Sequence, residues 1–154
     1  MEDRRCRDDA SRRDRATADA SDRLPIAALC PDQKSARELG SILKRLLPHA
    51  PYKAFRTPED CLRYAASHEI ALLFIDQSIY PHLSGLQTLH HKLRQISPHM
   101  DIIIVCDADK ANGAAAIWSI QSRCTDYLCR PLTADRIDRA LQNMWYHPAP
   151  TITK

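Results

Sequence analysis

Residues 70–76 read Ile-Ala-Leu-Leu-Phe-Ile-Asp, an unbroken run of six apolar residues that ends at a single carboxylate. A run of this length without polar alternation is typical of a strand buried on both faces of a parallel sheet, although a buried helix segment can show the same pattern. In such sheets the loops after the carboxyl ends of the strands form the ligand crevice. Because an unpaired buried charge is unfavourable, we expect Asp76 to lie at the floor of that crevice with a partner or a task.

Length and charge favour a single domain in the cytoplasm. A chain of 154 residues that is 44% hydrophobic fits one core. Its formal net charge of +3 indicates no particular partner, and we do not expect nucleic acid to be one. The longest apolar run has six residues, whereas a membrane-spanning helix needs about 20. The N-terminus is charged rather than apolar, so neither a secretory signal nor a membrane partner is expected.

The six cysteines are expected to remain reduced thiols. Cys30, Cys106, Cys124 and Cys129 lie in or beside apolar runs, where a thiol behaves as a small hydrophobe. Cys106 and Cys129 should both flank the crevice, so a redox-responsive pair is the alternative to two inert thiols. No CxxC occurs and the histidines are scattered, which argues against a metal site built from Cys and His.

The hydrophobic pattern divides the chain into two tails and one ordered region. Residues 1–23 hold seven Arg and seven Asp or Glu with almost nothing apolar, which predicts a disordered, solvated tail, with a nucleic-acid-binding arm as the alternative. We expect order over 24–146 and a flexible tail over 147–154. Five short segments, each followed by a helical pattern, predict strands at 25–30, 52–55, 70–75, 102–106 and 124–129; those at 70–75 and 102–106 are wholly apolar, and the signal at 52–55 is the weakest.

Helix starts are marked by residues that cap backbone N–H groups. Asp32, Thr57 and Thr133 stand immediately before helical patterns, and Pro58 follows the second of them. A further helix should follow the loop 77–85, with its apolar stripe at Leu86, Leu89, Leu93 and Ile96, and a less regular one should lie within 112–121. Strands that alternate with helices predict an α/β fold with a five-stranded parallel sheet and helices on both faces.

Two motifs carry a resemblance to a known family. Asp76 is followed by Pro81 and Gly85, and Asp-Tyr-Leu-Cys-Arg-Pro occupies 126–131. Over residues 24–145 the chain resembles the receiver domain of bacterial two-component response regulators, whose patterns are Asp-x-x-x-Pro-x-x-x-Gly and Asp-Tyr-Leu-x-Lys-Pro. The resemblance implies the doubly wound, flavodoxin-like strand order 2-1-3-4-5. The loop after Asp76 is one residue longer here than in the family pattern.

The resemblance also implies roles for residues. Asp76 takes the position of the aspartate that a histidine kinase phosphorylates, and Tyr127 that of the switch aromatic. Arg130 stands where the family has a lysine that contacts the phosphoryl group. The hydroxyl position falls on Cys106, or on Asp107 if the longer loop shifts the register.

The largest departure concerns the metal. The family's acid pair, which holds Mg²⁺ together with the central aspartate, is replaced by Cys30 and Pro31. The remaining oxygen ligands are Asp76 and, at the expected helix cap, Asp32. We therefore expect no required cofactor and a direct ion pair between Asp76 and Arg130, because Arg suits bidentate carboxylate pairing. Mg²⁺ held by Asp76 together with Asp32 or Asp107 is the alternative.

These features predict a stand-alone receiver-like signalling domain in two-component phosphorelay signalling, which acts by protein–protein contact and independently of phosphorylation. It is not expected to be an enzyme. The expected partner is a histidine kinase or a downstream signalling protein. A further possibility is a homodimer through the face made by the helix within 112–121, the strand at 124–129 and the helix that follows Thr133. The first alternative is a working phosphoacceptor at Asp76. A small α/β nucleotide-binding protein or enzyme is remote, because no GxGxxG or GxxxxGK[ST] loop occurs.

Overall fold

The computed structural model describes residues 24–107 and 113–144. The tails predicted at 1–23 and 147–154, and Trp145, lie outside these residues. The described strands are β1 (Ile26–Leu29), β2 (Tyr52–Phe55), β3 (Leu72–Asp76), β4 (Asp101–Cys106) and β5 (Asp126–Cys129). The described helices are α2 (Gln33–Leu46), α3 (Pro58–Ser67), α4 (Leu83–Ile96), α5 (Gly113–Gln121) and α6 (Ala134–Leu141), with a short 3-10 helix, η1 (Gln77–Ile79). No helix in this part of the chain is long and apolar enough to cross a membrane.

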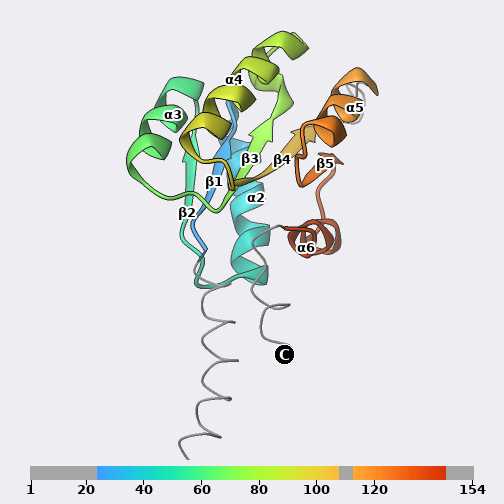
Figure 1. Ribbon diagram of the computed structural model, residues 1–154. Helices are drawn as coiled ribbons and strands as arrows, with labels where there is room; N and C mark the ends of the chain where they lie inside the picture. Colours follow the sequence, from blue (N-terminus) through green and yellow to red (C-terminus); the bar gives the residue numbers. More distant parts are fainter. Residues whose placement is uncertain (1–23, 108–112, 145–154) are drawn as a thin grey trace, which may run out of the picture.

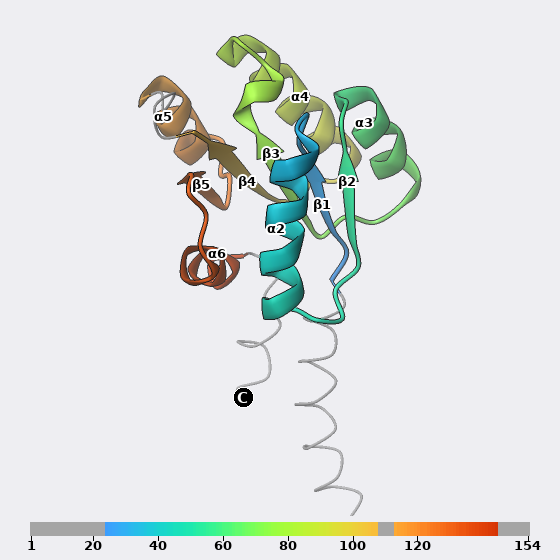
Figure 2. The ribbon, with the colours of Figure 1, turned by 180° about the vertical axis from the view of Figure 1, so that it is seen from behind.

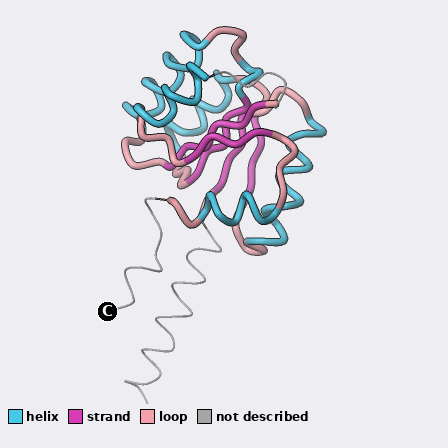
Figure 3. The backbone as a smooth tube through the Cα atoms, turned by 90° about the vertical axis from the view of Figure 1, so that its right-hand side faces the viewer, coloured by secondary structure: helices cyan, strands magenta, loops and turns pink. Residues whose placement is uncertain are grey.

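All five strands are parallel and form one sheet in the order β2-β1-β3-β4-β5, which confirms the predicted architecture (Figure 1). Helices α3 and α4 cover one face of the sheet, and α2 and α6 cover the other, as the view from behind shows (Figure 2). Figure 3 shows the sheet edge-on between these two helical layers. The carboxyl ends of β3, β4 and β5 meet at one edge of the sheet, so the residues that follow them are brought together.

The core explains why the run before Asp76 has no polar alternation. In β3, Leu72 and Phe74 pack with α2 and α6, whereas Leu73 and Ile75 pack with α3 and α4. All four of these side chains are fully buried. A strand with helices on both faces needs apolar residues at every position, so only its last residue, Asp76, can be polar.

The caps predicted from the sequence are confirmed. The side chains of Asp32, Thr57 and Thr133 accept hydrogen bonds from the first turns of α2, α3 and α6, respectively. The segment after Asp76 differs from the expected loop, because it forms η1 and then enters α4 at Leu83, two residues before Gly85. Ile96 was predicted on the buried stripe of α4 but is 39% exposed, because it lies in the last turn, beyond the sheet-facing Leu93.

Candidate functional site

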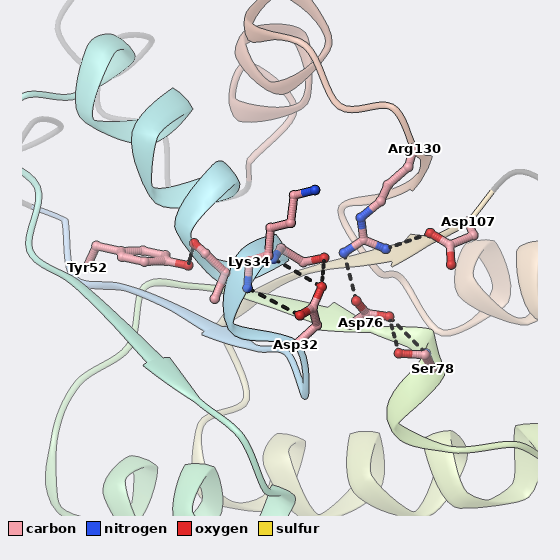
Figure 4. Close-up of polar contacts among 9 residues, drawn as sticks. Asp32, Lys34, Tyr52, Asp76, Ser78, Asp107 and Arg130 are labelled. Carbon is pink, nitrogen blue, oxygen red and sulfur yellow. Dashed lines mark hydrogen bonds and ion pairs between the residues drawn. The ribbon is translucent and has the colours of Figure 1, made fainter.

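Asp76 is the last residue of β3 and is 4% exposed. Its Oδ1 accepts hydrogen bonds from the backbone N–H of Ser78 at 2.9 Å and from the Ser78 hydroxyl at 2.7 Å. Its Oδ2 accepts a hydrogen bond from the guanidinium of Arg130 at 2.7 Å (Figure 4). Both carboxylate oxygens are therefore engaged by groups of the chain itself.

Arg130 reaches Asp76 from the segment directly after β5. Its backbone N–H donates to the carbonyl of Cys106 at 2.8 Å, which fixes the start of this segment against β4. The guanidinium forks between two carboxylates: Nη2 contacts Asp76, and Nη1 lies 3.2 Å from Oδ1 of Asp107 (Figure 4). Burial works to lower the pKa of Arg130, but its bonds to Asp76 and Asp107 outweigh burial and raise it. Arg130 is thus a permanent cation between two acids.

The residues after β1 offer little to a cation. Cys30 is 4% exposed, and burial, with a smaller effect from the charge of Asp76, raises its pKa to about 12, so it is a neutral thiol. Asp32 is turned towards α2, where its carboxylate accepts from the N–H groups of Lys34 and Ser35, each at 3.3 Å. These bonds, led by one from the Ser35 hydroxyl at 2.9 Å, lower the pKa of Asp32.

A Mg²⁺ ion, which the resemblance implies, does not fit these residues. Mg²⁺ requires near-octahedral oxygen ligands, whereas a buried neutral thiol and a proline replace the acid pair. Asp32 is used as a helix cap, and the free direction of Asp76 Oδ2 is taken by a guanidinium. Within residues 24–107 and 113–144, no three His, Cys, Asp or Glu side chains converge as a metal site. The carboxylates of Asp76 and Asp32, which were the predicted metal ligands, therefore do not converge on one site.

The predicted switch positions cluster around β4 and β5. Cys106 ends β4, Asp107 follows it, and Tyr127 lies within β5. The hydroxyl of Tyr127 donates to Oε1 of Gln77 at 3.0 Å, and its side chain also hydrogen bonds with the thiol of Cys106. The ring packs against the core on the α3–α4 side of the sheet, so Tyr127 points inward, towards the residue that follows Asp76.

Some contributors were not found by sequence reasoning. Ser78 could have been suspected, because a polar residue two positions after an aspartate can complete a side-chain turn. The pairing of Asp107 with Arg130 was not anticipated, and nothing in the local sequence marks Gln77 as the partner of Tyr127. Arg136 of α6 donates to the carbonyl of Cys129 at 2.6 Å and to that of Pro131 at 3.2 Å, and so supports the segment that carries Arg130.

Two hollows flank the Asp76–Arg130 pair. A cavity of about 320 Å³ adjoins Asp76 on the side of η1, and Gln77, Ser78, Tyr80, Pro81, Cys106 and Asp107 complete its lining. A wider cleft of about 820 Å³ lies between α2 and the segment after β5; residues that line it include Glu38, Ile42, Asp107, Arg130 and Leu132. Arg130 and Asp107 thus lie in the wall of this cleft, whereas Asp76 lines the smaller cavity.

No protein-family model and no curated protein sequence matches the chain. Solved structures do match. The receiver domain of a CheY-like response regulator from Methanospirillum hungatei is 16% identical, with a TM-score of 0.64 over 78% of this chain and 94% of that one. A response regulator from Burkholderia pseudomallei, solved with a phosphorylated aspartic acid and a calcium ion, is 19% identical, with a TM-score of 0.65 over 83% and 70%.

A third structure, the beryllofluoride-activated NtrC4 receiver domain dimer, is 12% identical, with a TM-score of 0.68 over 84% of this chain and 98% of that one. Sequence identities this low support a shared fold but do not show a shared chemistry at the site. The chain has the fold of a response-regulator receiver domain.

Proposed function

We propose that this chain is a receiver-like signalling module of the cytoplasm that acts in two-component signalling through protein–protein contact, without phosphorylation of Asp76. The observation that carries the proposal is the contact between Arg130 and Oδ2 of Asp76 at 2.7 Å. In the structure from B. pseudomallei the aspartic acid is phosphorylated with a calcium ion present. Here the corresponding carboxylate has a protein cation as its partner.

Charge supports this proposal. A phosphoryl group brings about −1.5 to −2 charge, and a divalent cation normally offsets it while orienting the oxygens. Arg130 supplies a single positive charge, which Asp76 and Asp107 already share. Phosphorylation would require Arg130 to leave a buried carboxylate, and Asp107 would then repel the incoming group.

One observation favours the alternative, a working phosphoacceptor at Asp76. The cavity of about 320 Å³ beside Asp76, whose lining does not include Arg130, leaves space for a small donor. This alternative needs the donor to react without a resident metal, and it predicts a modified Asp76 as a stable product.

The surface proposed for the partner lies on α5, beside the edge strand β5. Ile117 and Ile120 are 57% and 76% exposed and stand one helical turn apart. Exposed large apolar side chains that lie close together are typical of an interaction surface. The NtrC4 receiver domain is a dimer, and we propose that the face of α5, β5 and α6 serves a second copy of this chain or another signalling protein.

Phosphodonor chemistry tests the proposal. The chain is titrated with Mg²⁺, then with acetyl phosphate or BeF₃⁻, and followed by amide NMR and tryptophan fluorescence beside a receiver domain known to respond. The expected result is the same spectrum for wild type and Asp76→Asn at every donor concentration, apart from the site of substitution. Saturable shifts around Asp76 that vanish in Asp76→Asn would overturn the proposal and support the phosphoacceptor.

The proposed surface has its own test. Ile117→Lys and Ile120→Lys are expected to reduce self-association in sedimentation velocity, or capture of a histidine kinase or other signalling partner. Ile96→Lys is the matched control, because Ile96 is also exposed but lies on α4. Equal behaviour of all three variants would remove α5 as the contact surface.

A further inference from the structure

Two cysteine thiols meet between the last residues of β4 and β5. Cys106 and Cys129 are register partners in the parallel pairing of these strands, and their sulfur atoms lie 3.1 Å apart. Neighbouring strands are about 4.8 Å apart, and disulfides join Cα atoms separated by about 4.4–6.8 Å. The backbone therefore already holds this pair at a separation that a disulfide can bridge.

We propose that Cys106 and Cys129 form a redox site, which a low-molecular-weight disulfide such as oxidised glutathione converts to an intrachain disulfide. Both residues are free thiols in the structure. Forming the bond requires the sulfur atoms to approach from 3.1 Å to about 2.05 Å, a movement that χ1 rotation of the two side chains can supply.

The two thiols differ in solvent exposure, and this difference sets the order in which they react with the external disulfide. Cys129 is partly exposed, whereas Cys106 is 1% exposed. The thiolate of Cys129 attacks the external disulfide, forms a mixed disulfide and releases one small thiol. Cys106 then attacks the sulfur of Cys129 and releases the second small thiol. Two protein thiols are oxidised, one disulfide is reduced to two thiols, and the two protons pass to those products.

The position of the pair links its redox state to the candidate site. The carbonyl of Cys106 accepts the N–H of Arg130 at 2.8 Å, and Asp107 follows Cys106 directly. The thiol of Cys106 also hydrogen bonds with the side chain of Tyr127. A disulfide would fasten the two segments that carry Asp107 and Arg130 and would remove the thiol partner of Tyr127. Oxidation therefore acts on the geometry around Asp76 through the segments that carry Asp107, Tyr127 and Arg130.

The first test maps the bond. The reduced full-length chain is equilibrated anaerobically in glutathione buffers of increasing oxidised fraction, quenched in acid, alkylated and digested with trypsin. Trypsin does not cleave before Pro131, so the bond would join peptides 95–110 and 124–136. The expected product is two hydrogen atoms lighter than the sum of peptide 95–110 and peptide 124–136 alkylated once, at Cys124, and it forms reversibly as the buffer ratio changes. Full alkylation of both cysteines at every ratio would overturn the proposal.

Because peptide 124–136 also contains Cys124, variants identify the partner. The cross-link should persist in Cys124→Ser and in the control Cys61→Ser, whose thiol lies on the buried face of α3. It should be lost in Cys129→Ser. A cross-link that survives in Cys129→Ser would refute the assignment, and the result for the unsubstituted chain holds even if a variant folds poorly.

A second measurement tests the coupling to the site. Amide NMR of Cys124→Ser, recorded at the two ends of the glutathione range, should show shifts of the Arg130 and Tyr127 amides that are absent in Cys129→Ser. A disulfide that forms without moving these two amides would confine the inference to a redox site and overturn its connection with Asp76.

Discussion

Oδ2 of Asp76 and Nη2 of Arg130 lie 2.7 Å apart although 54 residues separate them in sequence. The pair spans the carboxyl end of β4, the strand that lies between β3 and β5. Asp76 is 4% exposed, so its charge depends on this contact and on Ser78 for compensation. The ion pair therefore has a structural role at the carboxyl ends of the strands.

Removal of Arg130 should destabilise the fold more than removal of Asp76. Arg130→Met leaves a buried carboxylate without its cation, and we expect a loss of about 2–4 kcal/mol in the free energy of unfolding. Asp76→Asn leaves Arg130 paired with Asp107, and we expect about 1 kcal/mol. Urea unfolding of both single variants and the double variant measures the coupling energy.

The control pair is Arg63 and Asp60, which lie 2.9 Å apart on the surface of α3 with side chains 76% and 53% exposed. Arg63→Met should cost less than about 1 kcal/mol. If Arg130→Met costs no more than this control, the Asp76–Arg130 contact is not a stabilising pair.

Restoring the acid pair should create metal binding. With Cys30→Asp and Pro31→Asp, together with Arg130→Lys, the site would have three carboxylates near one point and a cation that can withdraw. We expect a lower melting temperature in EDTA, because the added acids repel Asp76, and a rise that saturates with Mg²⁺. The wild type should show no such rise. If the melting temperature of the substituted chain does not rise with Mg²⁺, the missing acid pair is not the reason why the wild-type residues fail to bind the ion.

Gly85 permits the close approach of Tyr80 over the start of α4. A Cβ at Gly85 would collide with the Tyr80 ring, meeting its Cγ at 2.8 Å. Gly85→Ala should therefore destabilise by about 1–2 kcal/mol, although Ala is favoured over Gly in a helix by about 1 kcal/mol. In a Tyr80→Ala background the same substitution should become neutral or stabilising. Thermal unfolding of the four proteins tests this change of sign.

Acid should destabilise the contact between α4 and α5 through His90. Its ring lies edge-on to Trp118 with centroids 5.2 Å apart, and burial, followed by the charges of Arg94 and His91, lowers its pKa from 6.5 to about 4. The unfolded chain takes up this proton first, so the stabilisation is complete above pH 6.5 and is lost as the pH falls towards 4.

His90→Phe should remove about 1–2 kcal/mol of the pH dependence in that range, a value reduced for the partial exposure of the ring. His99→Phe, at an exposed position, is the control. Unfolding by urea at several pH values gives the comparison. Parallel pH profiles for wild type and His90→Phe would show that another group is responsible.

Periodicity predicted most of the fold, because the central strands β1, β3 and β4 are buried on both faces and stand in the sequence as largely apolar runs. In β3, Leu73 and Ile75 meet one helical layer and Leu72 and Phe74 the other, which is why this run shows no polar alternation. The start of α4 was less predictable. His82 makes no side-chain cap there, so the sequence lacks the signal that marked α2, α3 and α6.

The sequence predicted the residues of the candidate site and one of its contacts, the ion pair between Asp76 and Arg130. Parallel topology brings Asp76, Asp107 and Arg130 to one edge, but the second pairing, between Asp107 and Arg130, was not predicted. The carboxylate of Asp32 was ambiguous, because one side chain cannot both cap α2 and reach towards Asp76, and the cap is made. The contact between Tyr127 and Gln77 depends on how η1 winds after β3, which no pattern of residue types specifies.

The cation beside Asp76 belongs to the chain itself. A dissociable ion occupies a site according to the ratio of its concentration to its dissociation constant, and chelators or dilution remove it. Arg130 is covalently part of the chain, so its presence beside Asp76 does not depend on a free concentration. In addition, a partly buried ion pair is screened by salt far less than a surface pair. The charge of Asp76 is therefore balanced once the sheet has formed, and this balance depends far less on the ionic composition of the surroundings than a bound metal ion would.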